Sequence, residues 1–265
     1  MAKFGNKTVW ITGASSGIGE ACAYIFAAEK ANLILTGTRT DALQIIQEKC
    51  IGLGAKCKIL PFDLSDLDNI PTLVADAFKC FGNIDVLYNN AGISQRGLTA
   101  DTLFEVDKKI MDVNFFAPVY ITKLVLPEML KRKNGTIAVT SSVAGKFGFP
   151  LRSAYSASKH ALYGFFETLQ AEYYDQNIRV VMICPGFVKT NISMNALDNA
   201  GKRHAKLDAG LAGGISAEKA AKKIVNGIYK RKPEVLTGGK ELIMVYIKRF
   251  IPSLARLLAR KIKPS

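Results

Sequence analysis

The sequence predicts one α/β domain with a doubly wound, seven-stranded parallel sheet and helices on both faces. Short apolar runs alternate with helical patterns from end to end, and no Pro- or Ser-rich linker or internal repeat divides them. The runs are rich in Val, Ile and Leu without clean polar alternation, which is typical of parallel strands covered on both faces. Strands that alternate with helices along a chain favour a doubly wound sheet.

Each element is expected from one of these two patterns. The expected strands are the apolar runs at residues 8–12, 32–37, 56–61, 84–88, 136–141, 179–184 and 234–237. The expected helices lie between them, at residues 17–30, 41–53, 67–81, 102–111, 115–131, 153–175 and 217–230. A chain of 265 residues can form one such domain, because α/β folds often exceed the usual ~150 residues. We therefore expect a domain over residues 1–239 and a tail over residues 240–265.

One internal segment, residues 191–214, breaks the alternation between a strand and a helix. It contains Asn, Gly and Lys, with scattered apolar residues at Met194, Leu197, Leu207 and Leu211. Such a stretch is either a mobile lid or a disordered insertion, and lids over active sites are usually of this type.

The composition indicates a reduced, cytoplasmic protein with a substantial core. Hydrophobic residues make up 49% of the chain, and the five cysteines are odd in number, scattered and without a C-x-x-C pair. With only two histidines, no metal site is expected. No signal-peptide core precedes the first apolar run, and no uninterrupted apolar stretch looks long enough to span a bilayer.

The net charge of +14 raises the question of a polyanionic partner. The basic residues are mostly dispersed, and the chain shows no zinc-finger spacing, no RNA-recognition aromatic signature and no basic stripe interleaved with aromatics. No nucleic-acid partner is therefore expected. Anionic ligands or an anionic membrane surface explain the charge more simply.

A glycine-rich turn follows the first expected strand. The strand runs directly into T-G-A-S-S-G-I-G, which contains Gly13, Gly17 and Gly19, and then into a helical pattern. A turn of this kind lets backbone N–H groups and the helix dipole approach a pyrophosphate. Its position predicts a dinucleotide site at the start of the chain.

A tyrosine and a lysine one helical turn apart carry the strongest catalytic signal. Tyr155 and Lys159 stand at i and i+4 in S-A-Y-S-A-S-K-H, so they share one helix face, and Ser142 lies upstream. A phenol titrates near ~10, and a fixed cation ~4 Å away would lower that pKa by about three units. With a hydroxyl to hold a carbonyl oxygen, this set could move a proton onto or off an oxygen. Alone, the pair is also compatible with a solvated helix face.

Six motifs in their expected order make the chain resemble the classical short-chain dehydrogenase/reductase family, from about Lys7 to Thr237. They are the glycine loop, Asp63-Leu64, N-N-A-G at residues 89–92, Asn114, the Ser142/Tyr155/Lys159 set and P-G-F-V-K-T at residues 185–190. The loops V-A-G-K-F-G-F-P-L-R-S, N-A-G-I-S-Q-R-G and N-I-S-M-N-A further resemble the dehydrogenase/reductase branch related to 11β-hydroxysteroid dehydrogenase.

The resemblance implies a Rossmann-type fold, a nicotinamide cofactor and a set of site residues. The implied catalytic residues are Asn114, Ser142, Tyr155 and Lys159, with Asn114 relaying a proton through water. The implied cofactor-binding residues, besides Tyr155 and Lys159, are Gly13, Ser15, Ser16, Gly17, Ile18, Gly19, Thr38, Arg39, Asp63, Leu64, Asn90, Ala91, Gly92, Pro185, Gly186, Val188 and Thr190. Asn89 is implied to be structural.

The end of the second expected strand indicates NADP(H) rather than NAD(H). An acidic residue there would bind the ribose 2′-OH and repel a 2′-phosphate, and the strand ends L-T-G-T-R with no acid until Asp41. Thr38 occupies the selecting position, and the Arg39 guanidinium can grip a phosphate through two hydrogen bonds. Ser16 stands where some NADP-preferring relatives carry a second basic residue.

These implications together predict an oxidoreductase that interconverts a secondary alcohol and a ketone or aldehyde. The branch resemblance suggests a lipophilic carbonyl, of steroid, retinoid or fatty type. Phe147, Phe149 and Leu151 could form an apolar wall or belong to the core. The alternatives are a 3-oxoacyl thioester reductase of fatty-acid synthesis and a cofactor-binding regulator without catalysis.

The tail and the family resemblance suggest two kinds of partner. Apolar residues recur at helical spacing across residues 240–265, where seven Lys or Arg accompany one Glu. A basic amphipathic helix can lie in a membrane interface, so peripheral membrane contact is one expectation and packing on the domain or on a partner subunit is the other. The resemblance also implies a homodimer or homotetramer, packed through helices near residues 115–131 and 153–175.

Overall fold

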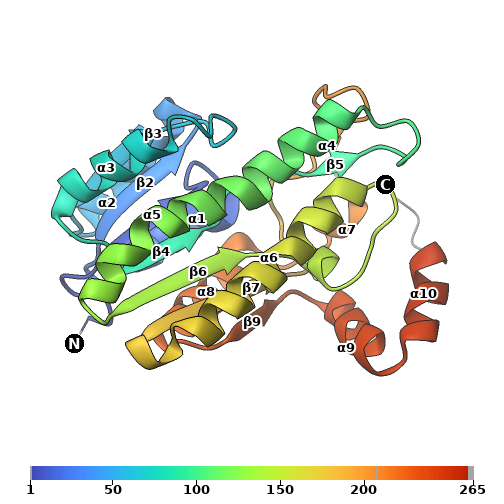
Figure 1. Ribbon diagram of the computed structural model, residues 1–265. Helices are drawn as coiled ribbons and strands as arrows, with labels where there is room; N and C mark the ends of the chain where they lie inside the picture. Colours follow the sequence, from blue (N-terminus) through green and yellow to red (C-terminus); the bar gives the residue numbers. More distant parts are fainter. Residues whose placement is uncertain (1, 207, 262–265) are drawn as a thin grey trace.

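The computed structural model describes residues 2–206 and 208–261, and it contains the predicted seven-stranded parallel sheet (Figure 1). The strands lie in the order β3-β2-β1-β4-β6-β7-β9. Their bounds are β1 Thr8–Thr12, β2 Asn32–Gly37, β3 Cys57–Pro61, β4 Val86–Asn89, β6 Gly135–Thr140, β7 Ile178–Pro185 and β9 Glu234–Thr237. The order doubles back between β1 and β4, so the sheet is doubly wound and the predicted Rossmann-type fold class is confirmed.

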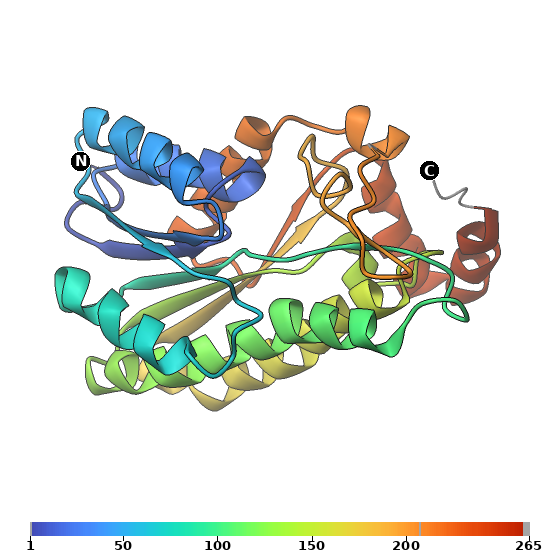
Figure 2. The same ribbon diagram turned by 90° about the horizontal axis from the view of Figure 1, so that it is seen from above.

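Helices cover both faces of the sheet in three layers (Figure 2). One face packs against α1 (Gly17–Ala28), α2 (Thr40–Gly52) and α8 (Ala217–Tyr229), and the other against α3 (Ile70–Phe81), α5 (Ala117–Lys131) and α6 (Ser153–Glu172). Successive side chains of β1 divide between the two cores: Val9 and Ile11 join the first, and Trp10 joins the second. This division explains why the strands read as continuous apolar runs.

The helix predicted over residues 67–81 begins later, at Ile70. Residues before it form a turn in which the Asp66 carboxylate accepts a hydrogen bond from the Asn69 amide nitrogen at 3.3 Å. Pro71 then occupies the first turn of α3, where its missing N–H costs nothing. The predicted start at residue 67 was therefore wrong. The helix predicted over residues 153–175 ends at Glu172, followed by a 3-10 turn, η3 (Tyr174–Gln176).

Two helices that the sequence separates form one continuous rod. A π-helical segment, η1 (Asp112–Phe116), joins α4 (Phe104–Met111) to α5. By length and composition alone, the combined rod, Phe104–Lys131, is long and apolar enough to cross a membrane. This finding corrects the expectation that no stretch of the chain is long enough to span a bilayer. Half of its most apolar window is buried within the protein, and its inner face belongs to the core described above.

The segment over residues 191–214 carries its own short elements. The two-residue strand β8 (Leu197–Asp198) pairs in parallel with β5 (Gln95–Arg96), and the short helix α7 (Ala209–Ala212) follows. These contacts attach the segment to the chain after β4. Leu207 lies outside the described residues.

The chain after β9 folds back onto the sheet edge. A 3-10 turn, η4 (Lys240–Leu242), leads into α9 (Ile243–Phe250) and α10 (Pro252–Lys261), which we call the C-terminal helical pair. In Figures 1 and 2 the pair lies at the end of the molecule opposite the N-terminus. The proposed division between a 1–239 domain and a 240–265 tail stays a prediction, and residues 262–265 of that tail lie outside the described residues.

Candidate active site

A cleft runs along the carboxyl ends of the central strands, where doubly wound sheets bind ligands. It consists of two cavities that share lining residues: Ile18, Asn90, Gly92, Thr140, Thr190 and Ile192. One cavity extends from the glycine loop towards Arg39, and the other surrounds Tyr155. The sequence-predicted cofactor residues line one or both cavities, with the exception of Gly19.

The glycine loop has the backbone shape that the sequence predicts for a phosphate cradle. Gly13 and Gly17 adopt positive φ angles of +66° and +61°, which only glycine adopts without strain. A Cβ atom on Gly13 would stand 2.6 Å from the Ala91 Cα atom. Ser16 precedes α1 without a side-chain cap, so the first N–H groups of that helix remain available for an anion. The loop therefore fits a pyrophosphate.

Asn90 fastens this loop to the end of β4. Its side-chain amide donates hydrogen bonds to the carbonyl oxygens of Thr12 and Gly13, at 3.2 and 3.1 Å. The neighbouring Asn89 is buried and donates to the Thr122 hydroxyl at 3.1 Å, which is a structural position. Gly19 lines neither cavity, and a Cβ atom there would collide with the Gly13 carbonyl oxygen, so the glycine allows α1 to pack against that carbonyl. Its contribution to the site is close packing.

The far end of the cleft holds the residues predicted to contact the adenosine half of a dinucleotide. Thr38, Arg39, Asp63 and Leu64 all line the same cavity. Arg39 is exposed, and its guanidinium donates to the Ser15 carbonyl oxygen at 2.5 Å. This contact holds a cation at the entrance beside the glycine loop.

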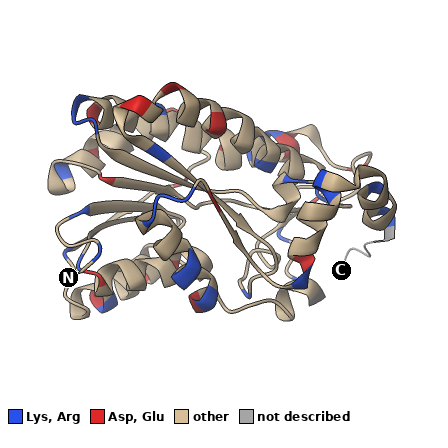
Figure 3. Cartoon of the chain, turned by 90° about the horizontal axis from the view of Figure 1, so that it is seen from below, with Lys and Arg blue, Asp and Glu red and all other residues tan. Residues whose placement is uncertain are grey.

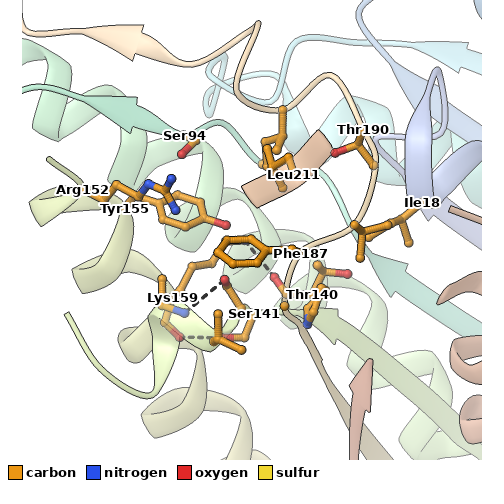
Figure 4. A pocket seen from close by; sticks show the side chains of 18 of the residues that line it. Ile18, Ser94, Thr140, Ser141, Arg152, Tyr155, Lys159, Phe187, Thr190 and Leu211 are labelled. Atoms are coloured by element: carbon orange, nitrogen blue, oxygen red, sulfur yellow. Dashed lines mark hydrogen bonds between the residues drawn. The ribbon is translucent and has the colours of Figure 1, made fainter. Parts of the chain in front are cut away.

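The predicted catalytic trio meets in the cavity at the other end of the cleft, where Figure 4 shows Tyr155 and Lys159 pointing inward from α6. Ser142 follows β6, and its side chain caps a short 3-10 turn, η2 (Val143–Gly145), by accepting a hydrogen bond from the Ala144 amide at 3.1 Å. Lys159 is 2% exposed and donates to the Thr140 carbonyl oxygen at 2.8 Å. Burial lowers the pKa of Lys159 to about 7.

Tyr155 titrates under opposing influences. Burial is the larger influence and raises the pKa of its phenol overall, while the Ser142 hydroxyl and the positive charges of Arg152 and Arg96 act to lower that pKa. From the sequence, Lys159 was expected to lower the pKa of this phenol. In the structure the Lys159 Nζ atom lies 5.8 Å from the Tyr155 ring centroid and donates to Thr140 instead.

Asn114 lies behind the cavity wall, within the π-helical segment η1. Its amide oxygen accepts a hydrogen bond from the Ile93 amide at 2.8 Å, and its amide nitrogen donates to the Ile93 carbonyl oxygen and the Ser158 hydroxyl. A Cβ atom on Gly92 would approach both Asn114 and Lys159, at 3.1 and 3.2 Å, so the two side chains are close to each other. Asn114 braces the site, and its proton-relay role stays a prediction.

A buried ion cluster beside Tyr155 was not found by sequence reasoning. Asp208 accepts hydrogen bonds from Arg96 Nε at 3.2 Å and from Arg152 Nη2 at 2.7 Å. Both arginines line the cavity, and Arg152 lies next to the Tyr155 ring in Figure 4. Arg96 and Asp208 stand 112 positions apart, so no local pattern could have paired them. The cluster anchors the 191–214 segment over the site.

The apolar wall differs in part from the predicted one. Phe149 lines the cavity, but Phe147 packs into a small core with Val143 and Cys184, and Leu151 lines neither cavity. Phe187 and Leu211 complete the wall from the P-G-F-V segment and from α7, as Figure 4 shows. Of the two alternatives left open for the three residues after Ser142, the wall holds for Phe149 and the core for Phe147, and Phe187 and Leu211 are wall residues that the sequence did not indicate.

Among residues 2–206 and 208–261, no group of three or more His, Cys, Asp or Glu is placed to hold a metal ion. The five cysteines are free thiols.

Comparison with known proteins identifies the chain's family. A family model described as short chain dehydrogenase matches residues 7–201. The chain belongs to the short-chain dehydrogenase family. This result confirms the resemblance stated from the sequence motifs.

Two relatives show which members of the family this dehydrogenase resembles. A mouse (Mus musculus) "Dehydrogenase/reductase SDR family member 7B" is 42% identical over 254 residues, covering 94% of this chain and 79% of the relative. An Anopheles gambiae "Dehydrogenase/reductase SDR family protein 7-like" is 44% identical over 235 residues, covering 87% of this chain and 74% of the relative. The names agree with the dehydrogenase/reductase resemblance of the loops.

Solved structures of family members share the fold. A Burkholderia phymatum short-chain dehydrogenase/reductase in complex with NAD has a TM-score of 0.84 and 25% identity, covering 96% of both chains. An actinorhodin polyketide ketoreductase variant with NADPH has a TM-score of 0.67 and 32% identity, covering 70% of this chain and 72% of the other. This short-chain dehydrogenase therefore has the fold of proteins that bind a nicotinamide cofactor, and its general activity is oxidoreduction.

Proposed function

We propose that this short-chain dehydrogenase is an NADP(H)-dependent oxidoreductase that interconverts a lipophilic ketone or aldehyde and the corresponding alcohol. One observation carries the proposal: Ser142, Tyr155 and Lys159 line a single cavity that shares walls with the glycine-loop cleft. A carbonyl compound bound beside Tyr155 would thus lie next to the ligand that the glycine loop binds.

The chain's own residues account for the proton and the positioning in this reaction. A bound nicotinamide supplies or accepts the hydride at the carbonyl carbon. Ser142 donates a hydrogen bond to the carbonyl oxygen, and Tyr155 passes its hydroxyl proton to the same oxygen during reduction. During oxidation Tyr155 takes that proton from the alcohol. Lys159 would bind the ribose hydroxyls next to the nicotinamide.

Replacing the phenol tests this mechanism directly. Tyr155→Phe should lower kcat by at least about a thousandfold, because general acid–base catalysis contributes on that order. Its affinity for NADPH, measured by fluorescence titration, should stay within about twofold. Tyr163→Phe is the matched control, since its phenol lies on the same helix but bonds Glu234 outside the cavity, at 2.6 Å. Robust turnover in Tyr155→Phe would refute the assignment.

The proposed preference for NADP(H) is supported by Thr38 and Arg39, a hydroxyl and a cation that line the cavity at its far end from Tyr155. Thr38→Asp should therefore reverse the ratio of kcat/KM for NADPH over NADH, by about tenfold or more. Thr72→Asp introduces the same charge on the exposed side of α3 and should leave the ratio unchanged. A preference for NADPH that survives Thr38→Asp would contradict the assignment.

The apolar wall formed by Phe149, Phe187 and Leu211 supports a lipophilic substrate. NADPH oxidation across steroid, retinoid, quinone and long-chain aldehyde carbonyls tests this class. Small polar ketones matched in intrinsic reactivity are the control. The proposal expects higher kcat/KM for the lipophilic compounds, and equal values for both groups would exclude it.

A second candidate is a 3-oxoacyl thioester reductase. The 32% identity to a polyketide ketoreductase with NADPH favours it. A carrier-bound and a coenzyme A-bound 3-oxoacyl thioester are added to the same panel to separate the two candidates. A higher kcat/KM for these thioesters than for the lipophilic ketones and aldehydes would favour the second candidate. NADPH binding without turnover of any compound would instead favour a cofactor-binding regulator.

A further inference from the structure

We propose that the C-terminal helical pair docks this dehydrogenase on an anionic membrane surface. The docking proposal does not depend on the substrate or the cofactor preference proposed above. It rests on an exposed apolar ridge, on the charge around that ridge and on the way the pair is fixed to the domain.

The helix α9 is apolar on two sides, and only one of them is used by the fold. Met244 and Val245 pack against a small core formed by Val143, Phe147 and Cys184. The opposite side carries Ile243 and Phe250, which are 62% and 72% exposed. The buried side explains why the helix folds onto the domain. The exposed side has no such explanation among the described residues.

The ridge continues onto α10, which packs against α9. Six large apolar side chains on the pair are at least 37% exposed: Ile243, Tyr246, Phe250, Ile251, Leu254 and Leu257. They fall within fifteen consecutive residues, 243–257. Clustered exposure of this kind is uncommon on a protein surface that meets only water, and it marks an interaction site.

The charges around the ridge select an anionic partner. Lys240, Lys248, Arg249, Arg256 and Arg260 are all exposed, and Figure 3 shows basic residues on both helices. The single acidic residue of the described tail, Glu241, turns inward: its carboxylate accepts hydrogen bonds from the Phe187 and Gly239 amides, at 2.6 and 2.8 Å. The outward charge of residues 240–260 is therefore entirely positive.

This combination fits a lipid surface better than a second copy of the chain. A two-fold contact through the pair would bring the five cations of each copy towards each other. An anionic bilayer attracts the same cations and accepts the apolar side chains at its acyl boundary. The exposed aromatic residues Tyr246 and Phe250 suit that boundary as well.

The position of the C-terminal helical pair would bring the cavity around Tyr155 close to the membrane when the protein is docked. In Figures 1 and 2 both helices project from the end of the molecule opposite the N-terminus. The small core beneath α9 includes Val143, which also lines the substrate cavity. A docked protein would thus hold this cavity near the lipid surface, where a lipophilic substrate partitions.

Vesicle flotation of the 265-residue chain tests the proposal. The probes are vesicles of equal parts phosphatidylcholine and phosphatidylserine, compared with vesicles of phosphatidylcholine alone. The wild type should float with the anionic vesicles, and added salt should release it. The variant K248E/R249E/R256E/R260E should bind at least about tenfold more weakly.

Two further variants make the result specific. K219E/K222E/K223E/K230E reverses four exposed lysines on and after α8, so it changes the net charge equally and should still float. I243S/F250S/L257S removes ridge side chains without touching charge and should also lose binding. NADPH affinity and a thermal unfolding midpoint close to those of the wild type show that each variant is folded.

Several results would overturn the proposal. They are absence of flotation in the wild type, equal binding to the neutral vesicles, and equal loss in the α8 control. A fall in sedimenting mass in I243S/F250S/L257S, without any vesicle binding by the wild type, would instead assign the ridge to self-association.

Discussion

At the scale of single residues, the charge around Tyr155 comes from two different places. Lys159 stands one helical turn away in the sequence, but it is buried and donates to the Thr140 carbonyl oxygen. Arg152 lies three positions before Tyr155, and its charge lowers the pKa of the phenol. The motif thus identifies the lysine, while the folded chain places the positive charge that acts on the phenol on the arginine.

Burial of Lys159 predicts a pH-dependent stability. Its pKa is about 7 in the folded protein and near 10.5 when exposed, so the unfolded chain binds more protons between these pH values. Stability should therefore rise with pH across this window, by about 2 kcal/mol between pH 7 and pH 9 from this group. Chemical denaturation of the cofactor-free protein at the two pH values measures it. Lys159→Met should remove this part of the rise, and an unchanged rise would contradict the burial argument.

Replacing Arg152 should shift the pH dependence of alcohol oxidation. In the proposed mechanism, oxidation needs Tyr155 without its proton, and loss of a nearby positive charge raises the pKa of the phenol. Arg152→Met should therefore move the rise of kcat/KM towards higher pH, and Arg152→Lys should restore part of the shift. Arg179→Met, whose guanidinium lies over Tyr174 at 3.8 Å, is the control. An equal shift in both methionine variants would argue against a local charge effect.

At the scale of elements, the sequence predicted the long ones and missed the short ones. Seven strands and seven helices follow from apolar runs and helical periodicity, because each spans enough residues to show a period. The strands β5 and β8 have two residues each, too few for any pattern. The π-helical segment at Asn114 breaks no apolar periodicity, so no pattern in the sequence indicates that α4 and α5 are joined.

One short element, η4, connects the C-terminal helical pair to the cofactor cleft. Glu241 accepts a hydrogen bond from the Phe187 amide, within the P-G-F-V-K-T segment that supplies several of the implied cofactor-binding residues. A Cβ atom on Gly186 would collide with the same carboxylate. Glu241 is therefore a positioning residue for this segment.

Glu241→Gln should weaken cofactor binding more than substrate binding. A charge-assisted hydrogen bond would become a neutral one, at a cost of about 1 kcal/mol, and the loosened segment should raise the KM for NADPH several-fold. Steady-state kinetics with each substrate varied in turn measure the split. Glu172→Gln, on the exposed end of α6, should change neither constant. Equal increases in both KM values would point to a general loss of structure.

Across the folded chain, how well a part of the site could be predicted from the sequence depended on how far apart in the chain its residues lie. The predicted catalytic trio and the glycine loop are local motifs, so their residue numbers followed from the sequence, and the fold brings them to one cleft. The Arg96–Asp208–Arg152 cluster and the Phe187–Leu211 wall join segments that only the folded chain brings together. The sequence likewise showed an amphipathic tail without showing which of its apolar residues the domain covers.

The assembly proposed from the family resemblance is supported by exposed side chains on η1, α5 and α6. Phe116 and Tyr120 are 46% and 38% exposed at one turn's spacing. Ala157, Gly164 and Ala171 form an exposed stripe of small residues on α6, at intervals of seven. Small residues let helices approach closely, and large apolar side chains supply burial, so the two faces together suit packing between copies of the chain.

Gly164→Glu should convert the proposed homodimer or homotetramer to a smaller species. A Cβ atom at Gly164 meets open space within one copy, so a side chain there should not disturb the fold but would obstruct a second copy. Sedimentation velocity should show the mass fall to that of a dimer or a monomer. Gly52→Glu places the same side chain in open space at the end of α2 and should leave the mass unchanged. If Gly164→Glu sediments like the wild type, copies of the chain do not meet through this face of α6.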